Sequence, residues 1–302
     1  MKHRILSLVI VCLNLFSISV FAQTNYPLPQ NPDTLRILGI GNSFTDDGMM
    51  YLPELLEAAG IKNVILGRLY IGGCSLEGHC IEDQKAPGEG RYIYYKSTEN
   101  KWEPGVKGTH LHTGIEDENW DIVVLQQQSG KSGWYMTYQP WLNQLIEIVR
   151  MHCSNAGACI AWQQTWSYAN TSKHGEFSRY GKSCNMMYQS IINCNKQLME
   201  DTQINVIIPS GTTVQNLRET AMADSLQFTR DGFHLDYKMG RYAAACAWFQ
   251  TLVAPVLKTN LAGNPCRLAG TEHVLTDEQA IACQLAARQA CARLFEVTKS
   301  EK

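Results

Sequence analysis

The sequence predicts an α/β fold: one doubly wound, mostly parallel sheet of five strands, flanked by helices in a single domain. Short apolar runs alternate along the chain with longer segments of helical periodicity. Polar or glycine-containing sequences follow several of the apolar runs, as expected at the carboxyl edge of a parallel sheet. The length of 302 residues, with 45% hydrophobic and 18% charged residues, fits one large globular domain.

The amino terminus has the features of a secretory signal peptide. Basic residues in 1–4 precede an apolar run from Ile5 to Phe21, and a sequence resembling a cleavage site ends at Ala22. The run is short for a membrane span. We therefore expect export to the periplasm or the medium, with no stable membrane insertion after cleavage. The expected segments are a signal peptide (1–22), an extended lead-in (23–34) and a catalytic domain (35–302).

Charge and cysteine content limit the classes of partner. The net charge is −2 and no Lys/Arg cluster is present, so nothing favours nucleic acid as a partner.

Ten cysteines follow the signal peptide, and an even number in an exported chain favours disulfides, with buried thiols as the alternative. The absence of a Cys-x-x-Cys pair gives little support to a zinc or thioredoxin-type site. The oligomeric state stays open. The spacing favours pairing Cys74 with Cys80, Cys153 with Cys159, Cys184 with Cys194, and Cys283 with Cys291.

Periodicity places the individual elements. Apolar runs predict strands at residues 35–40, 63–70, 121–128, 158–163 and 205–208. Apolar residues at helical spacing predict helices at residues 49–59, 109–119, 138–153, 179–201, 238–257 and 277–296. Residues 84–108 break this alternation, and their glycines around a Tyr-rich run favour a short aromatic hairpin.

The first strand leads into a turn that carries a serine. Gly41 and Asn42 suit tight backbone angles, Ser43 follows, and a helix comes next. A helix start presents unpaired N–H groups, which a nucleophilic Ser needs beside it, although many Ser at this position only cap the helix. Because Gly73, Gln128 and Gln163 also lie at or just beyond the carboxyl ends of predicted strands, all four residues fall at one sheet edge. This favours Ser43 as a nucleophile.

A nucleophilic Ser requires a base, and His234 is the best candidate among the eight His. It lies three residues after Asp231, with a Gly between them, so one turn can bring the carboxylate to an imidazole nitrogen. The other nitrogen is then available to face Ser43. His110 and His112 lie in a polar stretch without a matching pair of carboxylates, so we expect no metal site.

These motifs resemble those of a known superfamily. The segment 41–45 resembles the first block of SGNH (GDSL-type) hydrolases, 73–75 their second block, and 231–234 their Asp-x-x-His block. More narrowly, 120–129 and 234–242 resemble an uncharacterised Bacteroidetes-type branch. The resemblance spans roughly 35–257. It implies a flavodoxin-like fold, a triad and an oxyanion hole. The triad would be Ser43, His234 and Asp231, and the backbone N–H groups of Ser43 and Gly73 would line the oxyanion hole.

One block of that superfamily is missing. SGNH enzymes usually carry Gly-x-Asn-Asp, whose Asn completes the oxyanion hole, and here a run of three Gln occupies its place. Strand alternation puts Gln126 and Gln128 on one face, and we expect Gln128, nearer the strand end, to donate, with Gln126 as the weaker alternative. The chain also lacks a Gly-x-Ser-x-Gly elbow, which argues against an ordinary α/β-hydrolase.

We therefore expect a secreted serine esterase that removes acetyl or similar small acyl groups from carbohydrates, without a metal or organic cofactor. Tyr92, Trp102 and Trp166 are expected to stack on sugar rings. The alternatives are a non-catalytic carbohydrate-binding protein on the same scaffold and a lipid or aryl esterase. A lyase or transferase using the same acyl-enzyme also stays open. We find no broad apolar lid of the kind expected for a lipid esterase.

Overall fold

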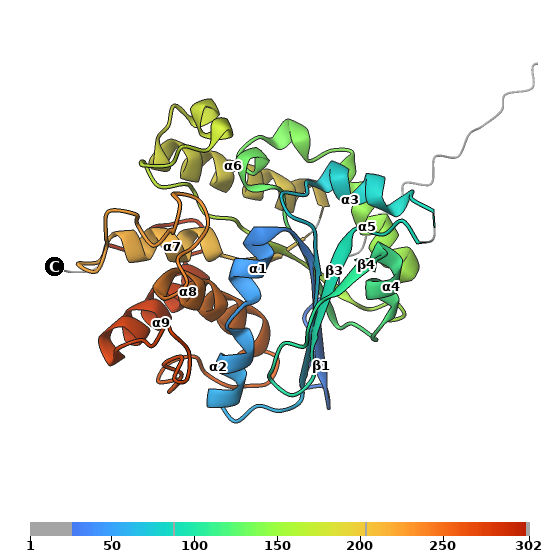
Figure 1. The fold of residues 1–302 in the computed structure, drawn as a ribbon, viewed down its shortest axis with the longest axis horizontal. Coiled ribbons are helices and arrows are strands. Elements are labelled where there is room, and N and C mark those ends of the chain that lie inside the picture. The colour runs from blue at the N-terminus through green and yellow to red at the C-terminus, as the bar shows by residue number, and fades with distance from the viewer. Residues whose placement is uncertain (1–25, 87, 203, 300–302) are drawn as a thin grey trace, which may run out of the picture.

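The computed structural model describes residues 26–86, 88–202 and 204–299. The expected signal peptide, and residues 23–25 of the lead-in, lie outside this part of the chain. Within the part described, one α/β domain surrounds a central sheet, which separates two groups of helices (Figure 1).

The sheet has seven strands in the order β4-β3-β2-β1-β5-β6-β7. The five predicted strands are present, and the four contacts among them are parallel. The predicted number of five is wrong, because the aromatic hairpin pairs with β2 through backbone hydrogen bonds and adds two antiparallel strands at that edge. The strands are β1 (Leu35–Gly41), β2 (Val64–Tyr70), β3 (Tyr92–Ser97), β4 (Val106–Thr109), β5 (Ile122–Leu125), β6 (Cys159–Gln163) and β7 (Val206–Ile208).

The central strands are buried on both faces, which explains why they read as continuous apolar runs. In β1, Leu35 and Ile37 belong to one hydrophobic cluster, whereas Leu38 and Ile40 belong to the cluster on the other face. Strands β5 and β6 alternate in the same way. The period of two along each strand thus divides the core into two layers.

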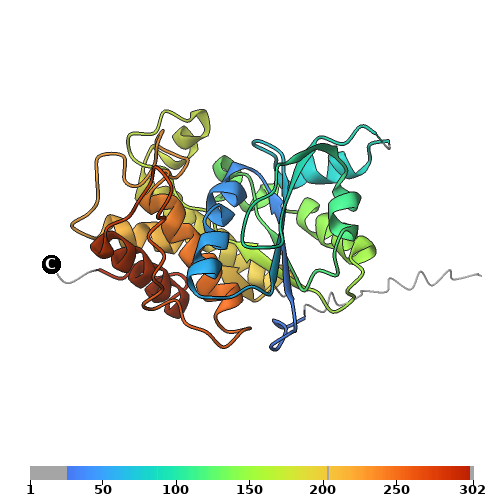
Figure 2. The same cartoon turned by 60° about the horizontal axis from the view of Figure 1, so that its bottom comes forward.

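Helices cover both faces (Figures 1 and 2). Residues of α2 (Leu52–Ala58), α8 (Met239–Trp248) and α9 (Asp277–Ala292) fill one cluster, together with Met49 of α1 (Ser43–Met49). Residues of α3 (Leu76–Asp83), α4 (Leu111–Glu116), α5 (Trp141–His152) and α6 (Cys184–Thr202) fill the other. The remaining helix, α7 (Ser210–Arg218), contacts α8 and α9.

The predicted helical segments do not include α3, α7 or, apart from its last residue, α1. The α7 sequence has three β-branched residues and a Gly among its nine residues, a composition of low helix propensity. Its first eight residues are nevertheless buried, so tertiary packing rather than propensity stabilises this helix. The predicted helix at 238–257 is present as α8, followed by a π-helical segment, Phe249–Val253.

The expected disulfides are absent from the described chain, where all ten cysteines are free thiols. Eight of them are buried and two are half-buried, so they pack as small apolar side chains. Burial raises the pKa of the Cys159 thiol to about 12, which keeps it protonated. The prediction of disulfides from the even number and the spacing of the cysteines is therefore wrong. Spacing along the chain does not give the distance between two thiols in the fold.

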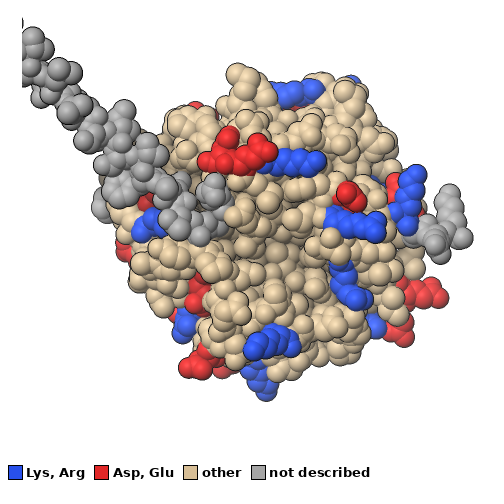
Figure 3. Space-filling view, turned by 180° about the vertical axis from the view of Figure 1, so that it is seen from behind, with Lys and Arg blue, Asp and Glu red and all other residues tan. Residues whose placement is uncertain are grey.

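Charges are sparse and mixed in sign on the face seen from behind Figure 1. Acidic and basic side chains lie next to one another there, and neither forms an extended field (Figure 3). Among the described residues no helix combines the length and the hydropathy that crossing a membrane would require.

Candidate active site

Ser43 lies at the junction of β1 and α1. The side chain of Asn42 accepts a hydrogen bond from the Phe44 N–H at 2.9 Å, so Asn42, not Ser43, caps the helix. The turn needs a glycine just before it, since a Cβ on Gly41 would lie 2.2 Å from the Thr45 hydroxyl. The Ser43 hydroxyl is therefore left without a capping role and can serve another purpose.

The structure brings Ser43, His234 and Asp231 together. His234 Nε2 lies 2.9 Å from Ser43 Oγ, and His234 Nδ1 lies 2.6 Å from Asp231 Oδ2. Ser43 and His234 are 191 positions apart in the chain. A carboxylate on one imidazole nitrogen and a hydroxyl on the other is the arrangement that activates a serine for nucleophilic attack.

The loop that carries Asp231 and His234 is held in a defined conformation. Asp231 Oδ1 accepts the backbone N–H groups of Phe233 at 3.0 Å and His234 at 2.7 Å. Gly232 has φ of +89°, and a Cβ there would lie 2.7 Å from Ser172 Cα, so only glycine fits. Partial burial acts to raise the pKa of Asp231, but the hydrogen bonds from His234 and the backbone outweigh it and leave that pKa below its usual value. The carboxylate therefore stays ionised.

Asp47, which the sequence analysis did not assign, ties this loop to the helix of Ser43. Its carboxylate is fully buried one turn beyond Ser43. It accepts hydrogen bonds from Arg230 at 3.1 and 3.2 Å, from Arg241 at 2.7 Å and from the Leu235 N–H at 2.9 Å. Burial raises the pKa of Asp47, while the two guanidinium groups act in the opposite direction. The position of His234 relative to Ser43 therefore depends on this buried carboxylate.

Trp166 supports the site from behind and is not available to a sugar. Its ring is fully buried and stacks on Phe44, with centroids 4.2 Å apart. Its indole N–H donates to the Phe233 carbonyl at 2.7 Å, within the loop that carries His234. The expectation that Trp166 stacks on substrate is wrong, because strand β6 directs the chain after it under the loop rather than over the pocket.

The two aromatic residues expected from the hairpin region also lie elsewhere. Tyr92 is fully buried, and its hydroxyl lies 2.7 Å from His79 Nδ1, so it is not a substrate wall. Trp102 is half-buried, donates to the Met50 carbonyl at 3.0 Å and stacks on Arg68. It does not line the pocket at Ser43. Pairing of the hairpin with β2 turned these rings towards the protein.

A pocket of about 270 Å³ opens at Ser43. Gly73 lies on its wall with φ of +66°. Gln128 lies there too, but its amide N–H₂ donates to Glu176 at 3.0 Å. Gln126 and Gln163 are buried and do not line it. The complete lining comprises Asn42, Ser43, Phe44, Tyr70, Gly72, Gly73, Gln128, Ser129, His174, Phe233 and His234.

The order of the strands explains this meeting of loops. Strand β1 lies between β2 and β5, and the three run parallel, so the segments that follow them emerge side by side. Those segments carry Ser43, Gly73 and Gln128. This is the switch point at which open α/β sheets bind their ligands.

Residues 36–282 match the model of the DUF4886 family, described as a domain of unknown function. The chain belongs to this family. The match covers the sheet and both candidate segments of the site, from β1 through the Asp231–His234 loop.

Solved structures similar to this chain include another member of the family. A DUF4886 family protein from Bacteroides uniformis is 35% identical, with 88% of this chain and 98% of that chain covered and a TM-score of 0.79. More distant is a protein from Slackia heliotrinireducens assigned to the SGNH hydrolases, at 20% identity, coverage of 72% and 98%, and a TM-score of 0.48. An acetylxylan esterase from Geobacillus stearothermophilus is 12% identical, with coverage of 74% and 96% and a TM-score of 0.48. No curated protein sequence matches the chain.

Proposed function

We propose that this protein is a serine ester hydrolase that removes acetyl or similarly small acyl groups, with carbohydrate esters as its substrates. The observation that carries the proposal is the hydrogen-bonded series from Asp231 through His234 to Ser43 at the mouth of a pocket. Neither a metal nor an organic cofactor takes part in this chemistry.

In the first half of the reaction, Ser43 Oγ attacks the ester carbonyl while His234 Nε2 accepts the hydroxyl proton. Asp231 holds the Nδ1–H of the imidazole and stabilises the imidazolium. Collapse of the tetrahedral intermediate transfers that proton to the leaving alcohol and leaves an acyl-Ser43 ester. In the second half, His234 deprotonates water, which attacks the acyl group and releases the carboxylic acid and free Ser43.

Backbone N–H groups supply the oxyanion hole in this proposal. Ser43 is the first residue of α1, so its N–H has no acceptor within the helix. No acceptor in the described chain contacts the Gly73 N–H, and this residue faces the same pocket. Gln128 is the proposed third donor, for which its amide would rotate from Glu176 towards the oxyanion. Loss of one such donor typically lowers kcat about a hundredfold or more.

The size of the pocket favours a small acyl group. About 270 Å³ lies just below the range of about 300–1,000 Å³ typical of pockets for drug-sized ligands. Tyr70 and Phe233 line this pocket and offer aromatic surface to a sugar ring next to the scissile ester. A long lipid chain would not fit in the same space.

We also propose that the chain is exported, on the strength of the basic and apolar residues in 1–22. Edman sequencing of the protein recovered from a periplasmic or secreted fraction should give Gln23 as the first residue. An N-terminus that still contains residues 1–22 would contradict it.

Hydrolysis of p-nitrophenyl acetate by the purified protein tests the catalytic proposal. Ser43→Ala and His234→Ala should each lower kcat by at least about a thousandfold while circular dichroism stays unchanged. The matched controls are Ser154→Ala and His273→Ala, outside the pocket, and they should keep the wild-type rate. A fluorophosphonate should label the wild type on Ser43 and leave Ser43→Ala unlabelled.

Two further results decide the substrate class. A series of p-nitrophenyl esters should show kcat/KM falling as the acyl chain lengthens, and a preference for long chains would favour a lipid esterase instead. The wild type should release acetate from acetylated xylan, and the Ser43→Ala and His234→Ala variants should not. Lack of turnover and of labelling in the folded wild type would overturn the hydrolase proposal and leave the non-catalytic carbohydrate-binding alternative.

A further inference from the structure

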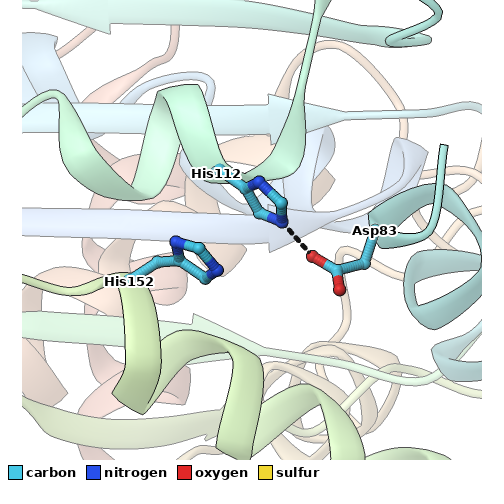
Figure 4. Close-up of side chains that lie close together, drawn as sticks. All are labelled: Asp83, His112 and His152. Atoms are coloured by element: carbon cyan, nitrogen blue, oxygen red, sulfur yellow. Dashed lines mark hydrogen bonds and ion pairs between the residues drawn. The ribbon is translucent and has the colours of Figure 1, made fainter. Parts of the chain in front are cut away.

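A second cluster of chemically capable side chains lies away from Ser43. Asp83 at the end of α3, His112 in α4 and His152 at the end of α5 converge, as Figure 4 shows. One ligand atom from each lies within 4.8 Å of the others. None of the three lines the pocket at Ser43, so this cluster is independent of the proposed esterase chemistry.

The side chains in this cluster lie against one another, and two of them are joined by a hydrogen bond. His112 Nε2 is hydrogen-bonded to Asp83 Oδ1, and the imidazoles of His112 and His152 stack with centroids 4.0 Å apart and planes 8° apart. In Figure 4 a ring nitrogen of each imidazole is on the side that faces Asp83. Histidine nitrogens together with a carboxylate oxygen are a ligand set that Zn²⁺ prefers.

Glu116 supplies the outer contact that metal-binding histidines usually have. Its carboxylate lies 2.7 Å from His152 Nδ1, which fixes the tautomer with the proton on Nδ1 and leaves Nε2 as the coordinating atom. This carboxylate–histidine pair is the feature that orients a metal ligand and raises its basicity.

The carboxylates next to this cluster give it a charge that suits a cation. Asp83 contacts His112 and Glu116 contacts His152. Two ionised carboxylates carry a charge of −2, which one divalent cation neutralises.

We propose that Asp83, His112 and His152 form a site for Zn²⁺ or a similar divalent transition metal. Bonds of about 2.0–2.2 Å in a tetrahedral site place neighbouring ligand atoms about 3.3–3.6 Å apart. To close on the ion, the side chains must therefore rotate so that their ligand atoms approach one another and the two imidazole planes tilt out of their parallel stacking. The three side chains are 20–34% exposed, which leaves the ion accessible from solvent. A hollow of about 650 Å³, lined in part by His112 and Glu116, gives room for water as the fourth ligand.

The bound ion joins three helices that the sequence places far apart. It links the ends of α3 and α5 to α4 on one face of the sheet (Figure 1). Helix α3 directly follows the turn that carries Gly73. We assign the ion a stabilising role and not a catalytic one, because it lies outside the Ser43 pocket and the ester chemistry needs no metal.

Calorimetric titration of the full mature chain with ZnCl₂, after EDTA treatment and desalting, tests the proposal. The wild type should bind one equivalent and gain in Tm, and EDTA should reverse both effects. His112→Ala and His152→Ala should each weaken binding by at least about tenfold, and Glu116→Gln should weaken it by up to about tenfold. His273→Ala, which removes a remote histidine, is the control and should bind as the wild type does.

Co²⁺ provides a readout that separates this site from the free thiols. Bound through nitrogen and oxygen, Co²⁺ should show visible ligand-field bands without an intense near-ultraviolet thiolate band. Asp83→Asn keeps the shape and hydrogen-bonding capacity of the side chain, so it serves if an alanine variant fails to fold. Failure of the folded wild type to bind Zn²⁺, equal binding by the His112→Ala/His152→Ala double variant, or a thiolate band would each overturn the proposal.

Discussion

Replacing Asp47 with asparagine tests whether the buried carboxylate positions the catalytic loop. The asparagine side chain would present one oxygen and one N–H₂ group where two oxygens now accept. If the N–H₂ replaces Oδ1 it faces Arg241 Nε, and if it replaces Oδ2 it faces the Leu235 N–H. Arg230 contacts both oxygens and loses half of its contact in either case. At least two hydrogen bonds therefore become repulsive contacts between donors.

The structure sets the expected size of the effect. Hydrogen bonds to a charged group are each worth about 1.5–3 kcal/mol, and breaking a buried ion pair costs about 3–5 kcal/mol. The Arg230 side chain is 23% exposed and can turn to water, and Arg241 keeps a 3.5 Å contact with Asp46. We therefore expect Asp47→Asn to lower the free energy of unfolding by about 3 kcal/mol, at the lower end of that range.

Urea unfolding at neutral pH measures this loss, and the midpoint should fall with the slope unchanged. In the absence of urea, where the variant is folded, kcat for p-nitrophenyl acetate should fall by about a hundredfold, because a small displacement of His234 from Ser43 is enough for that. Asp33→Asn, at an exposed carboxylate, is the matched control. A variant with stability within about 0.5 kcal/mol of the wild type and an unchanged kcat would refute the positioning role of Asp47.

Three further substitutions test the loop. Gly232→Ala should destabilise the protein by about 1–3 kcal/mol and lower esterase activity, because its positive φ and the contact with Ser172 exclude a Cβ; wild-type urea stability would contradict this. Trp166→Phe keeps the stacking but removes the donor to the Phe233 carbonyl, so we expect the free energy of unfolding to fall by about 1 kcal/mol and kcat to be lower. An unfolding midpoint equal to that of the wild type would contradict this. The lowered pKa of Asp231 contributes stability above the ordinary carboxyl pKa of about 4, and this is lost as the pH falls through the lower native value. Asp231→Asn should therefore have a lower urea midpoint than the wild type at pH 7, and the difference should narrow towards pH 3; a constant difference would count against the reasoning.

The sequence was most informative where a local rule decides the outcome. Apolar runs such as residues 122–125 predicted all five parallel strands, since burial on both faces leaves few polar positions in a central strand. The pairing of Asp231 with His234 was also predictable, because three positions around a glycine close within one turn. The match of Ser43 with His234 required the additional inference that parallel strands end at one edge of the sheet.

The aromatic residues were harder, because burial depends on what packs above a side chain. Tyr92 and Trp166 have the composition of sugar-binding residues, yet both are fully enclosed. The hairpin of Tyr92 joins the sheet edge through backbone hydrogen bonds, and such pairing leaves no distinctive side-chain pattern. The cysteines were misjudged for the same reason, since distance between thiols is a tertiary property.

The sequence by itself determined the alternation of strands and helices, the serine turn and the Asp-x-x-His segment, because each depends on contacts between close neighbours in the chain. Only the tertiary structure decided which side chains meet across the fold. Asp47 reaches a loop more than 180 positions away, and Asp83 meets His112 and His152 from three separate helices. The physical reason is that the distances between such side chains are set by how whole helices and strands pack together. A single stretch of sequence contains no information about that packing.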